Sequence, residues 1–397
     1  MEGMQQTKAG LSREALQELF PIKQHWAYFT TSVVGPLSLP AYQAMEDFNR
    51  RQMVEGCKSW PGWAADSDEV RVLAASLLNC RSRNIAFVSN TAFGIWLASR
   101  MIDWNAGDEV IVPFGEFPAN IYPWLSLEAQ GVKVRLLRPA EGEGRSQHVS
   151  PSSVTALINE RTRALSVSFV QYDDGCRRDV VSLGKLCRDH GIVFIIDAIQ
   201  GLGALPLAAD SCGADFIVSG GQKWLLSPPG IGLIYVADRW LEDCRVPNLG
   251  WFSVADPYNF AIESYAEALE RLSPDARRLE GGTPNFSAIA ALRENLKIIL
   301  DSGSAWISAR IEALTNRLVA GAESFGCAIV SPRADAHWSG IVSFSCPGID
   351  SQALHRRLLA HGVSTTVRQG RLRVAVHFFN DEAEIDRLLD VVSTTQG

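Results

Sequence analysis

Short apolar runs alternate with helical patterns through the middle of this chain. Seven runs have the length of buried strands, at 84–88, 108–112, 132–137, 164–170, 192–196, 214–218 and 233–236. Patterns with apolar positions at helical spacing lie between most of them, at about 91–101, 120–129, 152–160 and 181–190. Strands that alternate with helices predict an α/β fold, with a mostly parallel seven-stranded sheet covered by helices on both faces.

Different patterns precede and follow this alternating region. Helical patterns at about 39–57 and 66–78 come before it. After residue 236 the alternation weakens, and the remaining elements are expected as helices at 286–302, 305–325 and 382–392 and strands at 341–344 and 372–376. We therefore expect an N-terminal arm (1–20), a large domain (21–290) and a smaller α+β C-terminal domain (291–397).

Composition narrows the classes of partner. The chain has 397 residues, 47% of them hydrophobic and 20% charged, which is typical of a globular protein. Its net charge is −7 and it has no basic run, so neither nucleic acid nor an anionic membrane surface is expected as a partner. No apolar run approaches the ~20 residues of a membrane span. The polar start lacks the apolar core of a signal peptide, and we expect a cytoplasmic protein.

The eight cysteines are scattered along the chain without a C-x-x-C pair. In a long chain that we expect in the cytoplasm, this pattern predicts free thiols acting as small apolar residues, rather than disulfides or a zinc site. The seven histidines are also dispersed, and no metal site is predicted.

A single lysine, Lys223, lies between two expected core strands, in a segment that begins Gly220-Gly221-Gln222 and continues with Trp224. A buried lysine is costly unless its amine is neutral or covalently bonded. The small neighbours and the flanking strands therefore favour an imine-forming lysine over the alternative, a surface lysine at a turn.

Two other polar segments follow expected strands. Asp197 ends the apolar run at 192–196, either as a cap on the next turn or as an anion beside a cofactor's ring nitrogen. Asn90, Thr91 and Ala92 lie where a strand leads into a helix. Such a helix N-terminus either binds a phosphate or is an ordinary capped end.

Taken together, the strand-to-helix turn, the strand-end aspartate and the glycine-flanked lysine resemble the fold-type I pyridoxal-5′-phosphate (PLP) enzymes. More narrowly, the order resembles the class V aminotransferase superfamily, which includes cysteine desulfurases, isopenicillin-N-epimerase-like proteins and kynureninases. The resemblance runs from about residue 28 to residue 389. It implies PLP as the cofactor and an amino-acid-like small molecule as the substrate.

The resemblance also assigns roles to single residues. Lys223 would form the internal aldimine, Asp197 would pair with the pyridinium nitrogen, and Gln200 would contact the phenolic oxygen. Asn90, Thr91 and Ala92 match the phosphate-binding turn.

Two further assignments concern the phosphate. Gln222 stands where a histidine is frequent in the family, so its phosphate contact is a departure from the usual pattern. Thr283, in Glu280-Gly281-Gly282-Thr283-Pro284, matches a threonine that reaches the phosphate of the neighbouring subunit. This match implies a homodimer with shared active sites.

The loop after the second strand offers Phe117 where desulfurases carry a histidine. A phenyl ring stacks on a cofactor but transfers no proton, which leaves Lys223 for acid/base work. The alternative for Phe117 is core packing. Arg373 matches the arginine that holds the substrate carboxylate, with Arg371 and Arg368 as nearby competitors and a solvent-facing strand position as the alternative.

No cysteine stands between Arg368 and Arg371, where desulfurases carry a mobile-loop cysteine. From this absence we expect that the protein is not a cysteine desulfurase. The leading expectation is a lyase that forms an external aldimine, removes the Cα proton and expels a β-substituent, such as the thiolate of a cysteine conjugate. An aminotransferase, an epimerase and a decarboxylation-coupled deaminase remain alternatives.

A rival of another class is a non-catalytic binding module on the same fold, which predicts a degenerate site. The presence of Lys223, Asp197 and Thr91 argues against it. The aromatic segment at 248–252 either lines a roomy substrate pocket or packs at a dimer interface.

Overall fold

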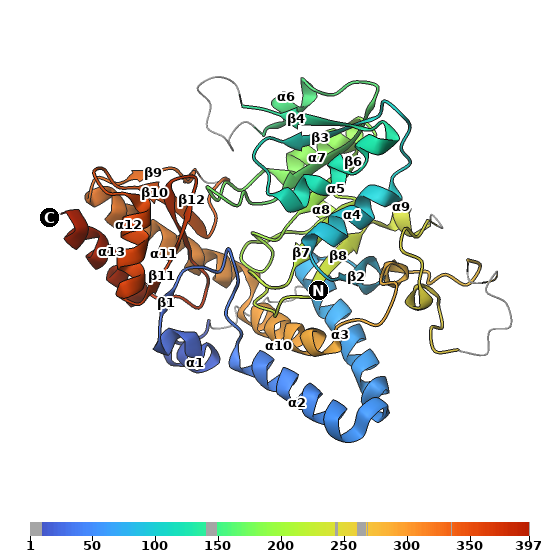
Figure 1. Ribbon diagram of the computed structural model, residues 1–397, viewed down its shortest axis with the longest axis horizontal. Coiled ribbons are helices and arrows are strands. Elements are labelled where there is room, and N and C mark those ends of the chain that lie inside the picture. Colours follow the sequence, from blue (N-terminus) through green and yellow to red (C-terminus); the bar gives the residue numbers. More distant parts are fainter. Residues whose placement is uncertain are drawn as a thin grey trace, which may run out of the picture.

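A seven-stranded sheet forms the centre of the molecule (Figure 1). The computed structural model describes residues 10–139, 149–242, 245–259, 267, 269–334 and 336–396. The strands lie in the order β2-β8-β7-β6-β5-β3-β4. Their bounds are β2 (Ile85–Val88), β3 (Glu109–Pro113), β4 (Lys133–Leu137), β5 (Thr162–Ser168), β6 (Val193–Asp197), β7 (Phe216–Gly220) and β8 (Gly232–Val236). Six of the strands run in one direction and only β8, between β2 and β7, runs the opposite way, so the predicted fold class is confirmed.

Both faces of this sheet are buried beneath helices. Alternate side chains of a strand point to opposite faces, so consecutive residues of one strand join different hydrophobic clusters. In β6, Phe194 and Ile196 join one hydrophobic cluster and Ile195 joins another. The helices over the sheet are α3 (Trp60–Leu78), α4 (Thr91–Met101), α5 (Tyr122–Leu125), α6 (Pro151–Thr155), α7 (Val180–Asp189), α8 (Ala209–Cys212) and α9 (Asp238–Leu241). A long helix, α2 (Leu39–Glu55), packs with α3 against α10 (Phe286–Ser302).

The helix expected at 120–129 is wrong over most of its length. Only the four residues of α5 are α-helical. Around them the backbone hydrogen bonds join residues three positions apart, as in Trp124 N–H to the Ile121 carbonyl (3.1 Å) and Leu127 N–H to the Trp124 carbonyl (3.0 Å). Pro123 at the start of α5 lacks an N–H donor, and the segment tightens into 3₁₀ turns instead.

A second, antiparallel sheet lies in the C-terminal part, in the order β12-β13-β10-β9. Its strands are β9 (Ala328–Ile329), β10 (Ile341–Ser345), β12 (Thr366–Arg368) and β13 (Arg371–Ala375). The helices around it are α11 (Ser304–Ser324), α12 (Ser351–Ala360) and α13 (Glu382–Gln396), of which α12 was not predicted. Near the N-terminus, β1 (Ala27–Tyr28) pairs in parallel with β11 (Val363–Ser364), and α1 (Arg13–Leu19) lies close by (Figure 1).

One pair of cysteines corrects the expectation of free thiols. Cys327 and Cys346 form a disulfide. Cys327 precedes β9 and Cys346 follows β10, and the register that pairs Ala328 with Ser345 makes the two cysteines the next opposed pair. The prediction failed because nothing in the local sequence of either cysteine shows that β9 and β10 are neighbours. The other described cysteines form no disulfide, and Cys244 lies outside the described residues; they are Cys57, Cys80, Cys176, Cys187 and Cys212.

Candidate active site

A cavity of about 350 Å³ lies at the carboxyl ends of β6 and β7, where open parallel sheets bind ligands. Nine of the ten predicted site residues line it: Asn90, Thr91, Ala92, Phe117, Asp197, Gln200, Gln222, Lys223 and Arg373. The other lining residues are Ser32, Val33, Ala119, Tyr172, Ile199 and Arg368. The fold thus brings together residues that are up to 341 positions apart, from Ser32 to Arg373.

One wall of the cavity is the start of α4. Asn90 caps this helix, and its side chain accepts a hydrogen bond from the Phe93 N–H (2.9 Å). The Thr91 hydroxyl accepts a hydrogen bond from the Gly220 N–H (2.9 Å), which ties α4 to the end of β7. A Cβ atom at Gly220 would lie 2.5 Å from Gln222 Oε1 and 3.2 Å from Thr91 Oγ1, so glycine keeps this corner open without displacing the Gln222 side chain. A helix N-terminus with an open corner suits a phosphate dianion.

Lys223 lies on a tight turn directly after β7. Backbone bonds fix the turn from three sides: Gly221 N–H to the Ile231 carbonyl (2.9 Å), Gly35 N–H to the Gln222 carbonyl (2.7 Å) and Leu226 N–H to the Lys223 carbonyl (3.1 Å). Leu226 is buried with a φ of 57°, a left-handed conformation that is costly for a leucine. The surrounding contacts therefore impose this turn on the chain.

The lysine and the predicted aspartate influence each other's protonation. Asp197 is buried and accepts a hydrogen bond from the Ile199 N–H (3.0 Å). Burial raises the pKa of Asp197 to about 7, and the charge of Glu116 adds to this effect while Lys223 opposes it. Burial lowers the pKa of Lys223 to about 8, and Arg373 and Arg368 add to this effect while Asp197 opposes it. Lys223 can therefore release its proton near neutral pH far more readily than an ordinary lysine.

Phe117 covers the lysine from the other side. Its ring centroid lies 5.5 Å from Lys223 Nζ and 5.3 Å from the Tyr172 ring, which meets it edge to face. The side chain is 45% exposed, so Phe117 is a wall of the cavity and not a core residue.

A buried ion pair lies beneath the Phe117 loop, and sequence analysis missed it. Arg178 Nη1 donates to Glu116 Oε1 (2.7 Å), and both side chains are at most 1% exposed. Glu116 also accepts hydrogen bonds from the Ser168 N–H (3.0 Å) and hydroxyl, and Arg178 Nη2 donates to Gln171 Oε1 (3.3 Å). Glu116 and Arg178 lie 62 positions apart, and neither stands in a motif that would signal the pair.

Arg373 is buried on β13, so the alternative of a solvent-facing arginine is wrong. Its Nε donates to Thr366 Oγ1 (3.1 Å) and its Nη1 to the Tyr172 carbonyl. Arg368, one of the two competitors, also lines the cavity, whereas Arg371 is not among the lining residues.

The two predicted glutamines lie against the same cavity. The Gln200 side chain is held by its own chain, because its Nε2 donates to the Ser32 carbonyl (3.0 Å) and its Oε1 accepts from Trp224 Nε1 (2.9 Å). Gln222 immediately precedes the lysine. Both positions can be recognised from the sequence alone, because each lies within three residues after the end of a strand.

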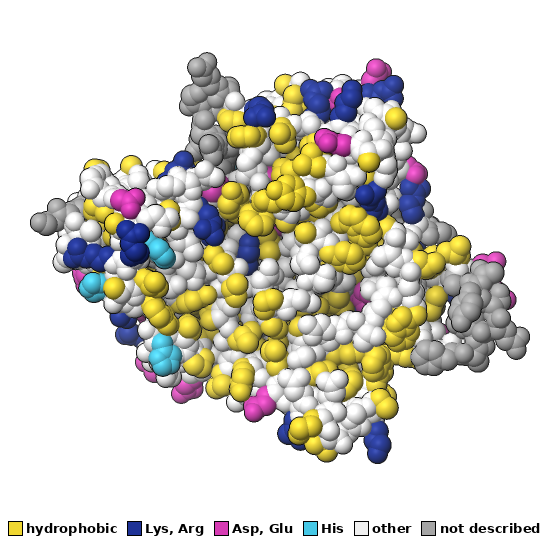
Figure 2. All heavy atoms as spheres, in the orientation of Figure 1, with side chains coloured by type: hydrophobic (Ala, Val, Ile, Leu, Met, Phe, Trp, Pro, Cys, Tyr) yellow, Lys and Arg dark blue, Asp and Glu magenta, His cyan; other side chains and the backbone are white. Residues whose placement is uncertain are grey.

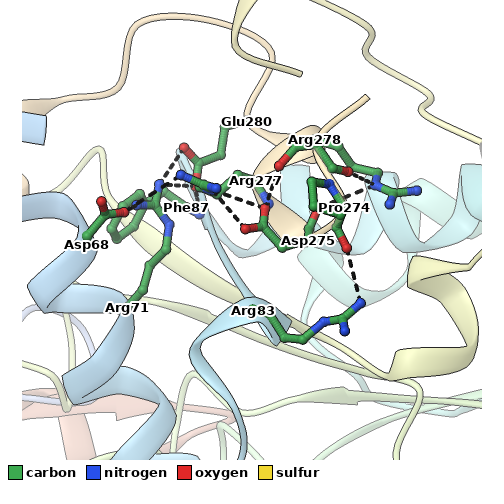
Figure 3. Close-up of polar contacts among 10 residues, drawn as sticks. Asp68, Arg71, Arg83, Phe87, Pro274, Asp275, Arg277, Arg278 and Glu280 are labelled. Carbon is green, nitrogen blue, oxygen red and sulfur yellow. Dashed lines mark hydrogen bonds and ion pairs between the residues drawn. The ribbon is translucent and has the colours of Figure 1, made fainter. Parts of the chain in front are cut away.

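Thr283 is the one predicted site residue that does not line this cavity, and it is exposed. The loop before it is firmly anchored, as Figure 3 shows. The Glu280 side chain is only 2% exposed, and its two oxygens accept hydrogen bonds from Arg71 Nη2 (2.7 and 2.8 Å). The Phe87 N–H of β2 donates to the same carboxylate (3.1 Å). The Thr283 loop is thus fixed to α3 and β2 of its own chain while its tip faces outward.

The groups that line the cavity fit PLP. A helix N-terminus with a threonine suits the phosphate, a depressed-pKa lysine suits an imine with the aldehyde, and a buried carboxylate suits the ring nitrogen. Within the described residues, no group of three or more histidine, cysteine or acidic side chains is placed to hold a metal ion. No helix in the described part of the chain is long and apolar enough to cross a membrane.

The model of the aminotransferase class V family matches residues 62–388, and the chain belongs to this family. The cofactor of the family is PLP, as the sequence predicted, and an amino-acid-like substrate is consistent with the family. The expected resemblance is therefore confirmed.

Several relatives and solved structures are similar along almost their whole length. A probable cysteine desulfurase of Methanothermobacter thermautotrophicus is 24% identical over 407 aligned residues, which cover 97% of this chain and 98% of the relative. The apo structure of a cysteine desulfurase from Thermococcus onnurineus is 20% identical with a TM-score of 0.84, covering 96% of this chain and 97% of that one. A complex between the cystine C–S lyase C-DES and its product cysteine persulfide is also 20% identical, with a TM-score of 0.84 and coverage of 94% and 99%.

These comparisons correct one expectation. We expected from the missing loop cysteine that the protein is not a cysteine desulfurase, and the similarity to cysteine desulfurases overturns that exclusion. The structure gives the local geometry. β12 and β13 form a hairpin joined by Gln369 and Gly370, both with positive φ (51° and 73°). A two-residue hairpin of this kind leaves no loop there, but the absence of one nucleophile is too narrow a signal to exclude a reaction class.

Proposed function

We propose that this protein is a PLP-dependent lyase that breaks the C–S bond of a cysteine-type amino acid. The observation on which this rests is the single cavity shared by Lys223, Asp197 and Arg373. That arrangement supplies an amine, a buried carboxylate and a cation for a substrate carboxylate. The sulfur chemistry is supported by similarity to proteins named as cysteine desulfurases and a cystine C–S lyase.

The cofactor would be held at both ends. Asn90, Thr91 and Ala92 at the start of α4 would bind its phosphate, together with Gln222. Asp197 would keep the ring nitrogen protonated, because a cation beside a buried carboxylate favours its charged form.

The remaining contacts would orient the ring. Phe117 would stack on one face of it, and Gln200, locked by Ser32 and Trp224, would contact the phenolic oxygen. When bound, PLP supplies an electron sink for bonds at the substrate Cα.

The protein's own residues would bind the substrate and move its protons. Arg373 is prepared for a carboxylate, because Thr366 and the Tyr172 carbonyl fix its guanidinium and leave Nη2 without a hydrogen bond within the described residues. Lys223 would take the Cα proton, since burial lowers the pKa of its amine to about 8. Phe117, whose ring centroid lies 5.5 Å from the amine, has no proton to give.

The elimination balances without an oxidant. The Cα–H and C–S bonds break, and the sulfur leaves with a proton as a thiol. Addition of one water to the remaining three-carbon fragment then releases pyruvate and ammonium. If the cleaved sulfur is instead passed to a thiol, the three-carbon product is alanine, as in a desulfuration.

We further propose that the protein acts as a homodimer in which Thr283 reaches the partner's cofactor phosphate. Thr283 is exposed and lies outside its own chain's cavity. Hydrophobic side chains are spread over much of the face in Figure 2. Among the described residues, large exposed hydrophobic side chains anywhere on the surface include Tyr42, Met53, Val54, Tyr122 and Leu125. A second copy covering such side chains would remove their apolar area from water.

The first test is the covalent bond to Lys223. The purified protein should absorb visible light from a bound imine. After borohydride reduction, the peptide that contains Lys223 should gain the mass of the reduced cofactor. Lys223→Ala should lose the adduct. A wild-type protein that takes up no added PLP and forms no adduct would refute the proposal.

The second test concerns the reaction. Incubation with cysteine and with S-substituted cysteines should release pyruvate with a thiol or sulfide, or alanine with a persulfide. Accumulation of pyridoxamine phosphate that is reversed by a 2-oxo acid, with no sulfur released, would show an aminotransferase instead.

The third test addresses the dimer. Mixed dimers of Lys223→Ala and Thr283→Ala chains should contain one site with neither change, if Thr283 acts across the interface. Partial activity in the mixture, with little in either variant alone, is the expected result. A monomer by analytical ultracentrifugation would contradict this part of the proposal.

A further inference from the structure

Two arginines, and not one, belong to the substrate part of the cavity. Arg368 ends β12 and Arg373 lies on β13 of the same hairpin. Arg373 pairs with Thr366, and Arg368 pairs with Arg371, so these side chains start from one face of the hairpin. Among the described residues that line the cavity, Asp197 is the only acidic one, and it belongs to the cofactor end of the proposed site.

The two guanidinium groups differ in how many hydrogen bonds they donate to their own chain. Arg373 donates to Thr366 and to the Tyr172 carbonyl, which leaves room for one carboxylate at Nη2. Within the described residues, the Arg368 side chain makes one hydrogen bond, from Nη1 to the Val367 carbonyl (2.9 Å). Neither arginine takes part in an ion pair within the described part of the chain.

Like charges in one cavity are unfavourable without an anion between or beside them. Burial lowers the pKa of Arg373 to about 10, and the charge of Arg368 adds to this effect, while the nearby Asp173 and Tyr172 oppose it. A single substrate carboxylate at Arg373 would still leave Arg368 without a counter-charge. Arginine is suited to oxyanions because its planar fork offers parallel N–H donors.

A buried hydroxyl adds an independent observation. Ser32 lines the same cavity, and its side-chain oxygen has no hydrogen-bond partner among the described residues although the residue is 2% exposed. Its carbonyl is already engaged by Gln200. Buried hydroxyls without partners are uncommon, and a polar ligand group in the cavity would supply the missing bond.

We propose that Arg368, with the Ser32 hydroxyl, forms a subsite for a second anionic group of the substrate. The substrate class is then a cysteine-type amino acid whose sulfur substituent ends in a carboxylate or a similar oxyanion. Its α-carboxylate binds Arg373 and its distal anion binds Arg368. This inference rests on the proposed function and deepens it.

Binding tests the subsite without any reaction. The holoenzyme is titrated calorimetrically with succinate and with succinamate, which differ only in one carboxylate replaced by a carboxamide. We expect succinate to bind about 10-fold more tightly or better, from one additional charge-assisted contact. Arg368→Gln should abolish this preference and leave the affinity for succinamate unchanged.

Matched variants separate charge from structure. Arg371→Gln removes an equal charge from the same hairpin face outside the cavity lining, and should retain the wild-type preference. Arg368→Lys keeps the charge without the fork, and should retain part of the preference. Equal affinity of the wild-type holoenzyme for the two ligands, or no detectable binding of succinate, overturns the inference. An equal loss of affinity for both ligands in Arg368→Gln also overturns the inference, because it means that both arginines bind the same carboxylate.

A substrate pair separates this inference from the proposed function. Pyruvate release is compared for S-carboxymethyl-L-cysteine and for its neutral isostere S-carbamoylmethyl-L-cysteine. We expect a kcat/KM at least about 10-fold higher for the charged substrate, lost in Arg368→Gln. Cleavage of both at equal rates overturns the second-anion subsite and leaves the lyase intact. If neither is cleaved while succinate is still preferred in binding, the reaction assignment fails and the subsite stands.

Discussion

Removal of Arg178 should be one of the most damaging single changes near the active site, although Arg178 does not line the cavity. The perturbation is Arg178→Met, which keeps much of the side-chain volume and removes the charge. It leaves Glu116, which is 0% exposed at its side chain, with hydrogen bonds from Ser168 alone. An uncompensated buried carboxylate is strongly destabilising, because its remaining options are to stay charged without a partner or to take up a proton.

The expected loss in the free energy of unfolding is about 3–5 kcal/mol, the usual cost of breaking a buried ion pair from one side. Changing both partners, in Glu116→Gln/Arg178→Met, should cost less than the sum of the two single changes, by about 1–3 kcal/mol. The coupling arises because the double variant contains no buried charge at this place.

Equilibrium urea unfolding of the holoenzyme, followed by fluorescence, measures these changes, with constant m-values as the check on comparability. Lys185→Met is the control, because Lys185 and Asp189 form an exposed ion pair on the surface of α7. We expect no measurable change there. If Arg178→Met is as mild as Lys185→Met, or if the two single changes add without coupling, the buried pair is not the support of the Phe117 loop that its geometry indicates.

Three further predictions concern other parts of the chain. Burial lowers the pKa of His377 to about 4, below the ~6.5 of an unfolded histidine. Its contribution to the free energy of unfolding, up to about 3 kcal/mol, should therefore be present above pH 6.5 and lost as the pH falls towards 4. His377→Gln should flatten the pH dependence of stability in urea unfolding over that window, and an unchanged pH profile would contradict the assignment. At Gly184 a Cβ atom would lie 1.7 Å from the Cys212 carbonyl oxygen, whereas at Gly62 it would meet nothing within 4 Å. Gly184→Ala should therefore cost about 3 kcal/mol or prevent folding and Gly62→Ala should gain up to about 1 kcal/mol, as measured by thermal unfolding, and similar effects at both would refute the packing argument. Cys346→Ser should remove the bond to Cys327 and cost about 3 kcal/mol under oxidising conditions, with no difference from wild type after full reduction; two free thiols in the oxidised wild type by mass spectrometry would show that the bond does not form.

The sequence by itself determined the elements of the central sheet and the cofactor end of the site. Each of these site residues is recognised from a local pattern, because it stands at or just after the end of its own strand. The run at 192–196 alternates between the two faces of the sheet and ends on Asp197, and Lys223 follows β7 by three positions. Because strand ends of a parallel sheet meet at one edge, these residues were predicted to lie together, and nine of the ten predicted residues do line one cavity.

Only the tertiary structure decided the features that join distant segments. Glu116 and Arg178 are 62 positions apart, and a buried ion pair leaves no periodic pattern in either segment. The disulfide of Cys327 and Cys346 depends on the register of β9 against β10, which two short strands do not reveal. Which of three nearby arginines line the cavity likewise needed the tertiary structure, because all three start from one hairpin face and only Arg368 and Arg373 are among the lining residues. Local pattern specifies which face of a strand is buried, whereas the partner of a buried charge or thiol is set by which strands and loops the fold makes neighbours.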